Sequence, residues 1–226
     1  MHSTIKSIAP VVTMLLLNIS SLTGIAQTNR FSISINSLTA NFNYGKLNSD
    51  LKPYKKNFTG LQAGVSYEAG ISPAFSLVPG IYFAMKGGKL KENNPVTINK
   101  STLKLYTIEV PVMARLYCNN LYFNAGPYGT YTIGGRLKIE GSSLIPSKTT
   151  RIAFGDATGD FRRWDVGLQA GAGYNFHGKK SVLTLDVRYG YGLVNISRDI
   201  ERYNRVLNIS LVASKAGKKG KNTKKG

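Results

Sequence analysis

The chain has 226 residues, and its 30 Lys and Arg against 11 Asp and Glu give a formal net charge of +19. Its single cysteine, Cys118, excludes an internal disulfide framework and a cysteine-based zinc site. So large a basic excess points to anionic partners such as nucleic acid, phosphorylated lipid or acidic glycans.

The first residues have the pattern of a secretory signal peptide. Lys6 precedes an uncharged stretch with an apolar centre, and the small residues Gly24 and Ala26 stand where signal peptidase requires them. The alternative, a transmembrane anchor, is disfavoured because the apolar centre is too short to cross a bilayer. We therefore predict a cleaved signal peptide over residues 1–26 and export from the cytoplasm. Export makes nucleic acid an unexpected partner.

Eight later segments alternate between apolar and polar residues, as strands with one apolar face do. The predicted strands are 30–44, 59–71, 74–86, 102–117, 121–137, 162–176, 181–195 and 203–213. Along 183–193 the alternation has no error. We expect one set of its side chains to face lipid: Leu183, Leu185, Val187, Tyr189, Tyr191 and Leu193.

The connections between these strands alternate strictly in length. Tight turns are predicted at 72–73, 118–120 and 177–180, whereas the links 45–58, 87–101, 138–161 and 196–202 are long. Short periplasmic turns and long extracellular loops are typical of outer-membrane barrels. The prediction is an all-β, eight-stranded antiparallel up-and-down transmembrane β-barrel over 27–214. A Lys-rich tail, 215–226, is predicted to be disordered.

The polar faces of the strands carry many glycines and several charges, which would be unusual in water-facing strands. Small residues leave room inside a narrow barrel, and opposite charges can pair there. A soluble lipocalin-like barrel would be apolar inside instead. We therefore predict a charge network in the lumen, formed by Glu68, Glu109, Arg115, Asp165, Asp186 and Arg188.

Aromatic residues near the strand ends suggest the interfacial girdles of a membrane barrel, with ordinary cross-strand packing as the alternative. The expected girdle residues are Tyr117, Tyr122, Tyr174 and Phe176 at the tight-turn rim, and Tyr44, Tyr106, Tyr131 and Tyr191 at the loop rim. The long loops are basic, which suggests contact with lipopolysaccharide phosphates. In the first loop we predict this contact for Lys46, Lys52, Lys55 and Lys56.

Nothing in the sequence indicates a catalytic or metal site. Of the two histidines, His2 leaves with the predicted signal peptide and His177 falls in a predicted turn. A barrel hydrolase needs a histidine with Ser or Asp near a rim, and transition metals need a His or Cys cluster. The expectation is a protein that is not an enzyme and binds no cofactor.

Four segments in order resemble the PorT-like outer-membrane β-barrel family of Bacteroidota. Residues 106–112 resemble its Tyr-x-x-Ile-Pro-hydrophobic strand and 126–131 its Gly-Pro-Tyr strand. Residues 165–174 resemble its Asp-hydrophobic-Gly segment, and 188–196 its Arg-Tyr-x-x-Gly-Leu-x-Asn-Ile segment. The departure is the last strand, which ends at Ser214 without the usual terminal aromatic residue.

This resemblance implies an integral outer-membrane barrel with a structural or envelope-machinery role, and one specific role is in type IX secretion. An eight-stranded barrel has room only for its own side chains, so we expect a filled lumen. Two alternatives stay open: a small-solute or lipid-binding porin-like channel, and a secreted soluble basic β-protein.

Overall fold

The computed structural model describes residues 29–141, 146–179 and 181–215. The predicted signal peptide and residues 216–226 of the predicted tail lie outside these ranges. Within them, no helix is long and apolar enough to cross a membrane. Eight long strands in the described part are β1 (Arg30–Asn43), β3 (Phe58–Ser72), β4 (Phe75–Leu90), β5 (Ser101–Cys118), β6 (Leu121–Ile139), β8 (Trp164–His177), β9 (Ser181–Gly192) and β10 (Tyr203–Lys215).

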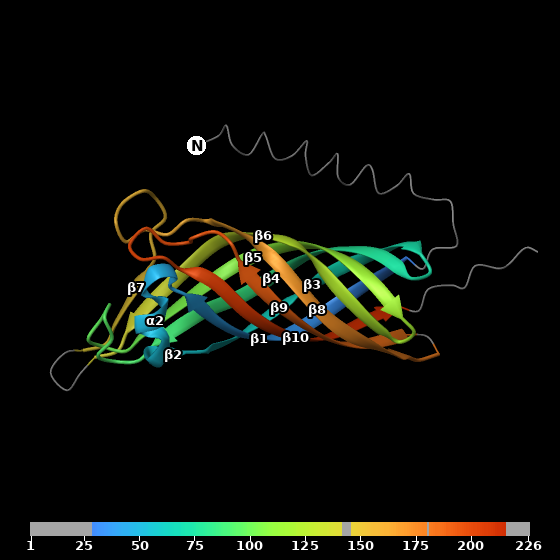
Figure 1. Cartoon of the computed structure of the whole chain (residues 1–226), viewed down its shortest axis with the longest axis horizontal. Helices are drawn as coiled ribbons and strands as arrows, with labels where there is room; N and C mark the ends of the chain where they lie inside the picture. Colours follow the sequence, from blue (N-terminus) through green and yellow to red (C-terminus); the bar gives the residue numbers. More distant parts are fainter. Residues whose placement is uncertain (1–28, 142–145, 180, 216–226) are drawn as a thin grey trace, which may run out of the picture.

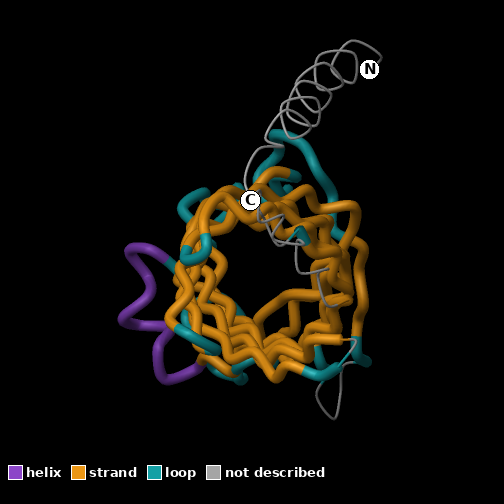
Figure 2. The backbone as a smooth tube through the Cα atoms, turned by 90° about the vertical axis from the view of Figure 1, so that its right-hand side faces the viewer, coloured by secondary structure: helices purple, strands orange, loops and turns teal. Residues whose placement is uncertain are grey.

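These strands form a closed antiparallel barrel (Figure 1). Each pairs with the next long strand along the chain, and β1 closes the ring against β10, with Ser32 opposite Ser214 and Ile35 opposite Leu211. Figure 2 looks along the barrel from the tight-turn end and shows the strands as a ring. The predicted eight-stranded up-and-down barrel is confirmed. Both ends of the described chain lie at the tight-turn end.

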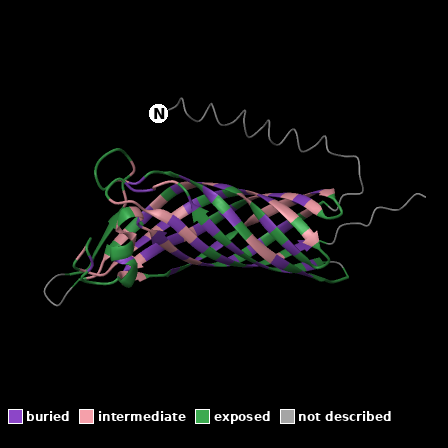
Figure 3. Cartoon of the chain, viewed as in Figure 1, coloured by how far each residue is buried: buried purple, intermediate pink, exposed green. Residues whose placement is uncertain are grey.

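The alternation within the strands separates an outer apolar face from an inner face. In β9, Leu183, Leu185 and Val187 are exposed, whereas Asp186 and Arg188 at alternate positions are buried. The same separation recurs along most of the other long strands, so exposed and buried residues alternate around much of the wall (Figure 3). An apolar surface of this extent needs a lipid or protein environment.

Several boundaries differ from the predicted ones. Strand β4 runs four residues beyond the predicted end, to Leu90, and β9 ends at Gly192. Strand β10 includes Lys215, which pairs with Ser181, so the predicted disordered tail begins one residue too early. In the tight turn after β5, Asn119 has φ 56°, a left-handed conformation that Asn tolerates better than most residues.

The predicted long loops contain short ordered elements. In the first loop, 3-10 helix η1 (Gly45–Leu47), helix α2 (Asn48–Leu51) and 3-10 helix η2 (Lys52–Tyr54) lead into strand β2 (Lys55–Lys56), which pairs with β4. In the third, strand β7 (Lys148–Arg151) pairs with β6. Strands β4 and β6 run on past their predicted ends, and these extensions supply the edges that the short strands need.

An apolar cluster fills the barrel at the loop end. Its buried members are Phe42, Tyr44, Leu51, Leu90, Leu103, Leu105, Phe161 and Ile196. The expected polar, glycine-rich inner face therefore gives way to apolar side chains at this end. Leu51 of α2 is fully buried, so burial of apolar surface holds the first loop against the barrel mouth. Placing Tyr44 in an outer aromatic girdle was wrong, because its side chain belongs to this cluster.

Candidate functional site

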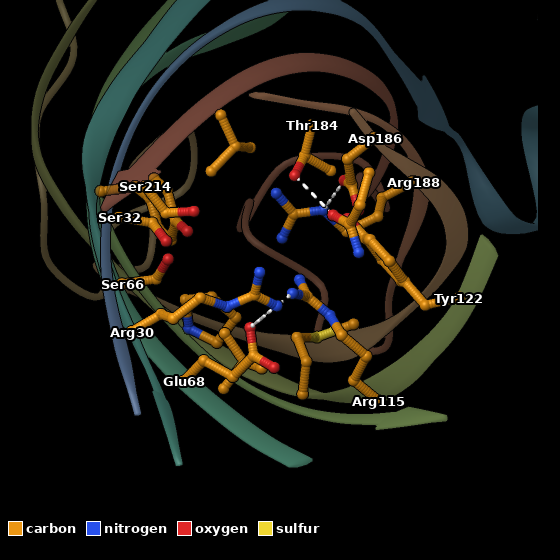
Figure 4. A pocket seen from close by; sticks show the side chains of 16 residues that line it. Arg30, Ser32, Ser66, Glu68, Arg115, Tyr122, Thr184, Asp186, Arg188 and Ser214 are labelled. Carbon is orange, nitrogen blue, oxygen red and sulfur yellow. Dashed lines mark hydrogen bonds and ion pairs between the residues drawn. The ribbon is translucent and has the colours of Figure 1, made fainter. Parts of the chain in front are cut away.

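The barrel interior holds four buried carboxylates. Nearest the tight turns lies Glu68, which is hydrogen-bonded by Ser76 and Tyr117. One of its oxygens accepts from two guanidinium groups, Arg30 at 2.9 Å and Arg115 at 3.3 Å. Figure 4 shows Glu68 between these two arginines, which come from opposite sides of it. Charge-assisted bonds of this kind are stronger than neutral ones.

The second carboxylate, Asp186, lies across the lumen from Glu68 (Figure 4). It accepts hydrogen bonds from Arg188 Nε at 2.6 Å, Tyr122 Oη at 2.6 Å and Asn124 Nδ2 at 3.0 Å. The Arg115 guanidinium of the first group stacks 3.9 Å from the Tyr122 ring centre. That stack is a cation–π contact, and it joins the first two layers into one packed unit.

The third carboxylate, Glu109, forms the middle of the network. It pairs with Lys86 and accepts hydrogen bonds from Gln169 Nε2 at 2.7 Å and Gln62 Nε2 at 3.3 Å. The Lys86 and Glu109 side chains are only 2% and 4% exposed. A buried ion pair needs such extra hydrogen bonds because both ions have lost their water.

The fourth carboxylate, Asp165, lies nearest the loop end. It accepts from Asn204 Nδ2 at 2.8 Å and more weakly from Tyr128 Oη at 3.5 Å. In the described part of the chain it makes no ion pair. The structure thus places all six predicted network residues inside the barrel, but in separate layers, with Asp165 held by neutral groups.

Inward glycines make the room that the large inward side chains occupy. A Cβ on Gly173 would lie 2.3 Å from the Tyr122 ring, and one on Gly167 would lie 2.6 Å from the Tyr128 ring. Real Cβ contacts are never so short, so a substitution at either glycine must displace the ring opposite. Each aromatic ring therefore fills the space beside a neighbouring glycine, which agrees with the expected use of small residues.

Little space is left along the axis. Two internal cavities have about 20 Å³ and about 10 Å³ accessible to the centre of a water molecule, room for roughly one water each. The first lies among the layers of Glu68 and Asp186, and the second beside Glu109 and Tyr128. Side chains and, at the loop end, the apolar cluster occupy the lumen around these two cavities.

Two cations of the network are missing from the predicted set, Arg30 and Lys86. Both could have been found by strand parity: Arg30 precedes the inward Ser32 by two positions, and Lys86 follows the inward Tyr82 by four. Two residues that were expected in the outer aromatic girdle, Tyr117 and Tyr122, instead have the parity of the inner face. Tyr117 bonds Glu68 and Tyr122 is fully buried, so both point into the barrel and not toward lipid.

Other aromatic residues do line the outside. Tyr131 and Trp164 stack edge to face at 5.0 Å near the loop end, and Tyr174 and Phe176 lie 4.9 Å apart near a tight turn. The exposed Tyr191 ring carries the Arg205 guanidinium at 3.4 Å. Such pairs suit membrane–water interfaces, where one side of a ring is apolar and the other wet.

The first-loop lysines divide into two groups. Lys46, Lys52 and Lys56 are exposed. Contrary to the expected role, Lys55 is turned toward its own loop, where its Nζ donates to Asn48 Oδ1 at 2.9 Å and the Phe42 carbonyl at 3.3 Å. Burial lowers the pKa of Lys55, and the neighbouring charges of Arg205 and Lys52 lower it further. Lys55 thus stabilises the loop and is not free for an external anion.

Among the described residues, no three His, Cys, Asp or Glu side chains form a group that could hold a metal ion. The acids of the interior are spread over separate layers, and His177 stands exposed at the end of β8.

A family model described as outer membrane protein beta-barrel domain matches residues 25–198. No curated protein matches the sequence. Among solved structures, Neisserial surface protein A has 12% identity and a TM-score of 0.44, with 82% of this chain and 96% of that one covered. Ail of Yersinia pestis, in complex with the heparin analogue sucrose octasulfate, has 16% identity and a TM-score of 0.41, with 84% and 99% covered. AlkL in lipid bilayers has 15% identity and a TM-score of 0.38, with 85% and 92% covered.

Proposed function

The chain belongs to the family of the outer membrane protein beta-barrel domain, and from that premise we propose that it serves as a closed structural barrel of the envelope or as part of an envelope machine. The observation that supports the proposal is the set of inward side chains in the lumen, four carboxylates in bonded layers beneath an apolar cluster. We also propose that residues 1–26 are removed on export. A channel role has no comparable support, because the internal cavities have room only for about a water each.

The more specific proposal is a PorT-like part in type IX secretion, supported by the ordered resemblance of four strand segments. We expect a strain lacking the protein to release less type IX cargo into the medium, with the loss reversed by the intact gene. If cargo release is normal and the outer membrane becomes more permeable to detergent, the role is structural instead. Normal secretion together with normal permeability would contradict both forms of the proposal.

The exposed first-loop lysines support a contact with lipopolysaccharide sugars and phosphates outside the barrel. We expect the triple variant Lys46→Gln, Lys52→Gln, Lys56→Gln to bring less lipopolysaccharide through purification than the wild type, because exposed cations attract its anionic groups. Lys55→Gln is the matched control and should leave the amount unchanged, since the Lys55 amine is bonded within the loop. An unchanged amount in the triple variant would remove the contact.

A further inference from the structure

One side of the barrel wall extends beyond the rest at the loop end. Strand β6 pairs with β8 only as far as Tyr131, opposite Trp164, but stays paired with β5 as far as Ile139, opposite Ser101. Strand β4 follows β5 to the same level, and β2 and β7 add to the edges of this extension. Figure 1 shows both short strands at that end.

Two rows of residues in register cross the outer face of this extension. The first joins Lys56, Lys89, Thr102, Lys138 and Thr149, from β2 through β4, β5 and β6 to β7. The second joins Gly87, Lys104, Arg136 and Arg151. Directly opposed residues point to the same side of a sheet. We call the six cations the basic wall: Lys56, Lys89, Lys104, Arg136, Lys138 and Arg151.

The basic wall faces away from the barrel interior. Its chain neighbours Leu90, Leu103 and Leu105 are buried in the apolar cluster inside, and side chains of adjacent strand residues point to opposite faces. Lys56, Arg136, Lys138 and Arg151 are exposed, while Lys89 and Lys104 are partly exposed. The outer surface of the extension is thus available to a partner.

Like charges stand directly opposite one another here, which destabilises a sheet. Lys56 opposes Lys89, and Arg136 lies between Lys104 and Arg151. In the described part of the chain none of the six cations makes an ion pair. The Lys89 and Lys104 amines instead make cation–π contacts with the same aromatic ring. They lie 5.8 Å and 5.9 Å from the centre of the Phe58 ring.

Glu140, two residues after Lys138 in the chain, is already bonded to Lys100 at 2.9 Å. That hydrogen bond holds the pKa of Glu140 below its usual range, and the charges of Lys138 and Lys89 lower it further. Glu140 is thus paired with a lysine outside the basic wall, and the six cations of the wall present a positive surface.

The apolar band of the barrel runs directly into the basic wall. On β5 the outward residues pass from Val110 and Ile108 through Tyr106 to Lys104, and on β4 Phe83 and Met85 lead to Lys89. Two strand residues span about 7 Å, so Lys104 stands one such step above Tyr106 and Lys89 two steps above Met85. An amphiphile with an anionic head and apolar chains matches this order, whereas an acidic protein or a free anion would use the wall alone.

We propose that the basic wall binds the phosphate groups of an outer-leaflet glycolipid whose acyl chains lie on the apolar band beneath. The proposal rests on the outer-membrane location but not on the closed lumen. A bound phosphate between the opposed cations turns their mutual repulsion into attraction, which explains why six of them are kept in register. The partner is thus recognised by strand residues and not by the first-loop lysines alone.

The test is a titration of the full-length barrel, folded in non-ionic detergent, with diphosphoryl lipid A, read by native mass spectrometry. We expect Lys104→Gln with Arg136→Gln to weaken binding about 30-fold, since each cation near an anionic lipid surface contributes about a 5-fold change in affinity. The matched control is Lys179→Gln with Lys215→Gln, which removes two exposed lysines at the opposite end and should leave binding unchanged. Monophosphoryl lipid A should bind less tightly than the diphosphoryl form.

A second variant keeps the test decisive if the first one folds poorly. Thr102→Lys places a seventh cation between Lys89 and Lys138. We expect it to bind diphosphoryl lipid A more tightly than the wild type and to unfold more easily without lipid. Equal lipid affinity in all variants, or complete displacement of the lipid by inorganic phosphate, would overturn the proposal. A failure here leaves the lumen unaffected, so it is distinct from a failure of the proposed function.

Discussion

Replacing Lys86 by Met is expected to lower the free energy of unfolding of the barrel by about 3–5 kcal/mol, the range for removing one partner of a buried ion pair. The substitution fills the same space but leaves the Glu109 carboxylate in the barrel centre without its cation. The remaining donors, Gln62 and Gln169, are neutral and cannot replace it. Denaturant unfolding in micelles measures the change.

Two controls make this result specific. Adding Glu109→Gln to Lys86→Met should restore most of the lost stability, because no buried charge is then left unpaired. Lys100→Met removes one partner of the exposed pair with Glu140, and should change the free energy of unfolding by no more than about 1 kcal/mol. A double variant as unstable as Lys86→Met alone would show that the lysine matters for packing and not for charge.

Much of this architecture follows from alternation along the strands. In β9 the period of two assigns Asp186 and Arg188 to one face and Leu185 and Val187 to the other, and closure of the sheet turns the charged face inward. The alternating lengths of the connections then give the strand order. Both signals are local in the sequence, which is why they can be read without the structure.

Alternation along the strands was not enough to predict the apolar cluster at the loop end. Its members Phe42 and Tyr44 share the inward parity of Ser34 and Asn36, so parity alone places them inside. The assumption of a polar lumen concealed this. What makes the site apolar is tertiary: Leu51 of the first loop and Phe161 of the third come over the barrel mouth to join the strand residues.

Contacts between side chains on different strands could also not be predicted from the sequence. The Glu68 carboxylate meets Arg30 and Arg115 only because β1, β3 and β5 curve around one lumen. The basic wall depends on a register that pairs Lys104 with Arg136, and a one-residue slip would send one of them to the other face. Closure and register are set by all the strands together, so no single segment contains them.

The second large effect concerns the passage of ions. In the described barrel a solute moving along the axis would meet the cation pair at Glu68, the Asp186–Arg188 pair, the Lys86–Glu109 pair and then the apolar cluster. Every one of these layers would have to open, and buried ion pairs are strongly destabilised by separation. We therefore expect the intact barrel to conduct no ions, although eight strands surround a lumen.

Single-channel recording in planar bilayers tests this claim most directly. The purified full-length barrel is inserted at low density, with an open sixteen-stranded porin recorded in parallel to show that the bilayer reports channels. A side-chain-filled barrel predicts a flat baseline after insertion, with insertion itself verified by protease protection of the strands. Stable, discrete current steps from the wild-type protein would contradict the closed lumen and establish a channel in its place.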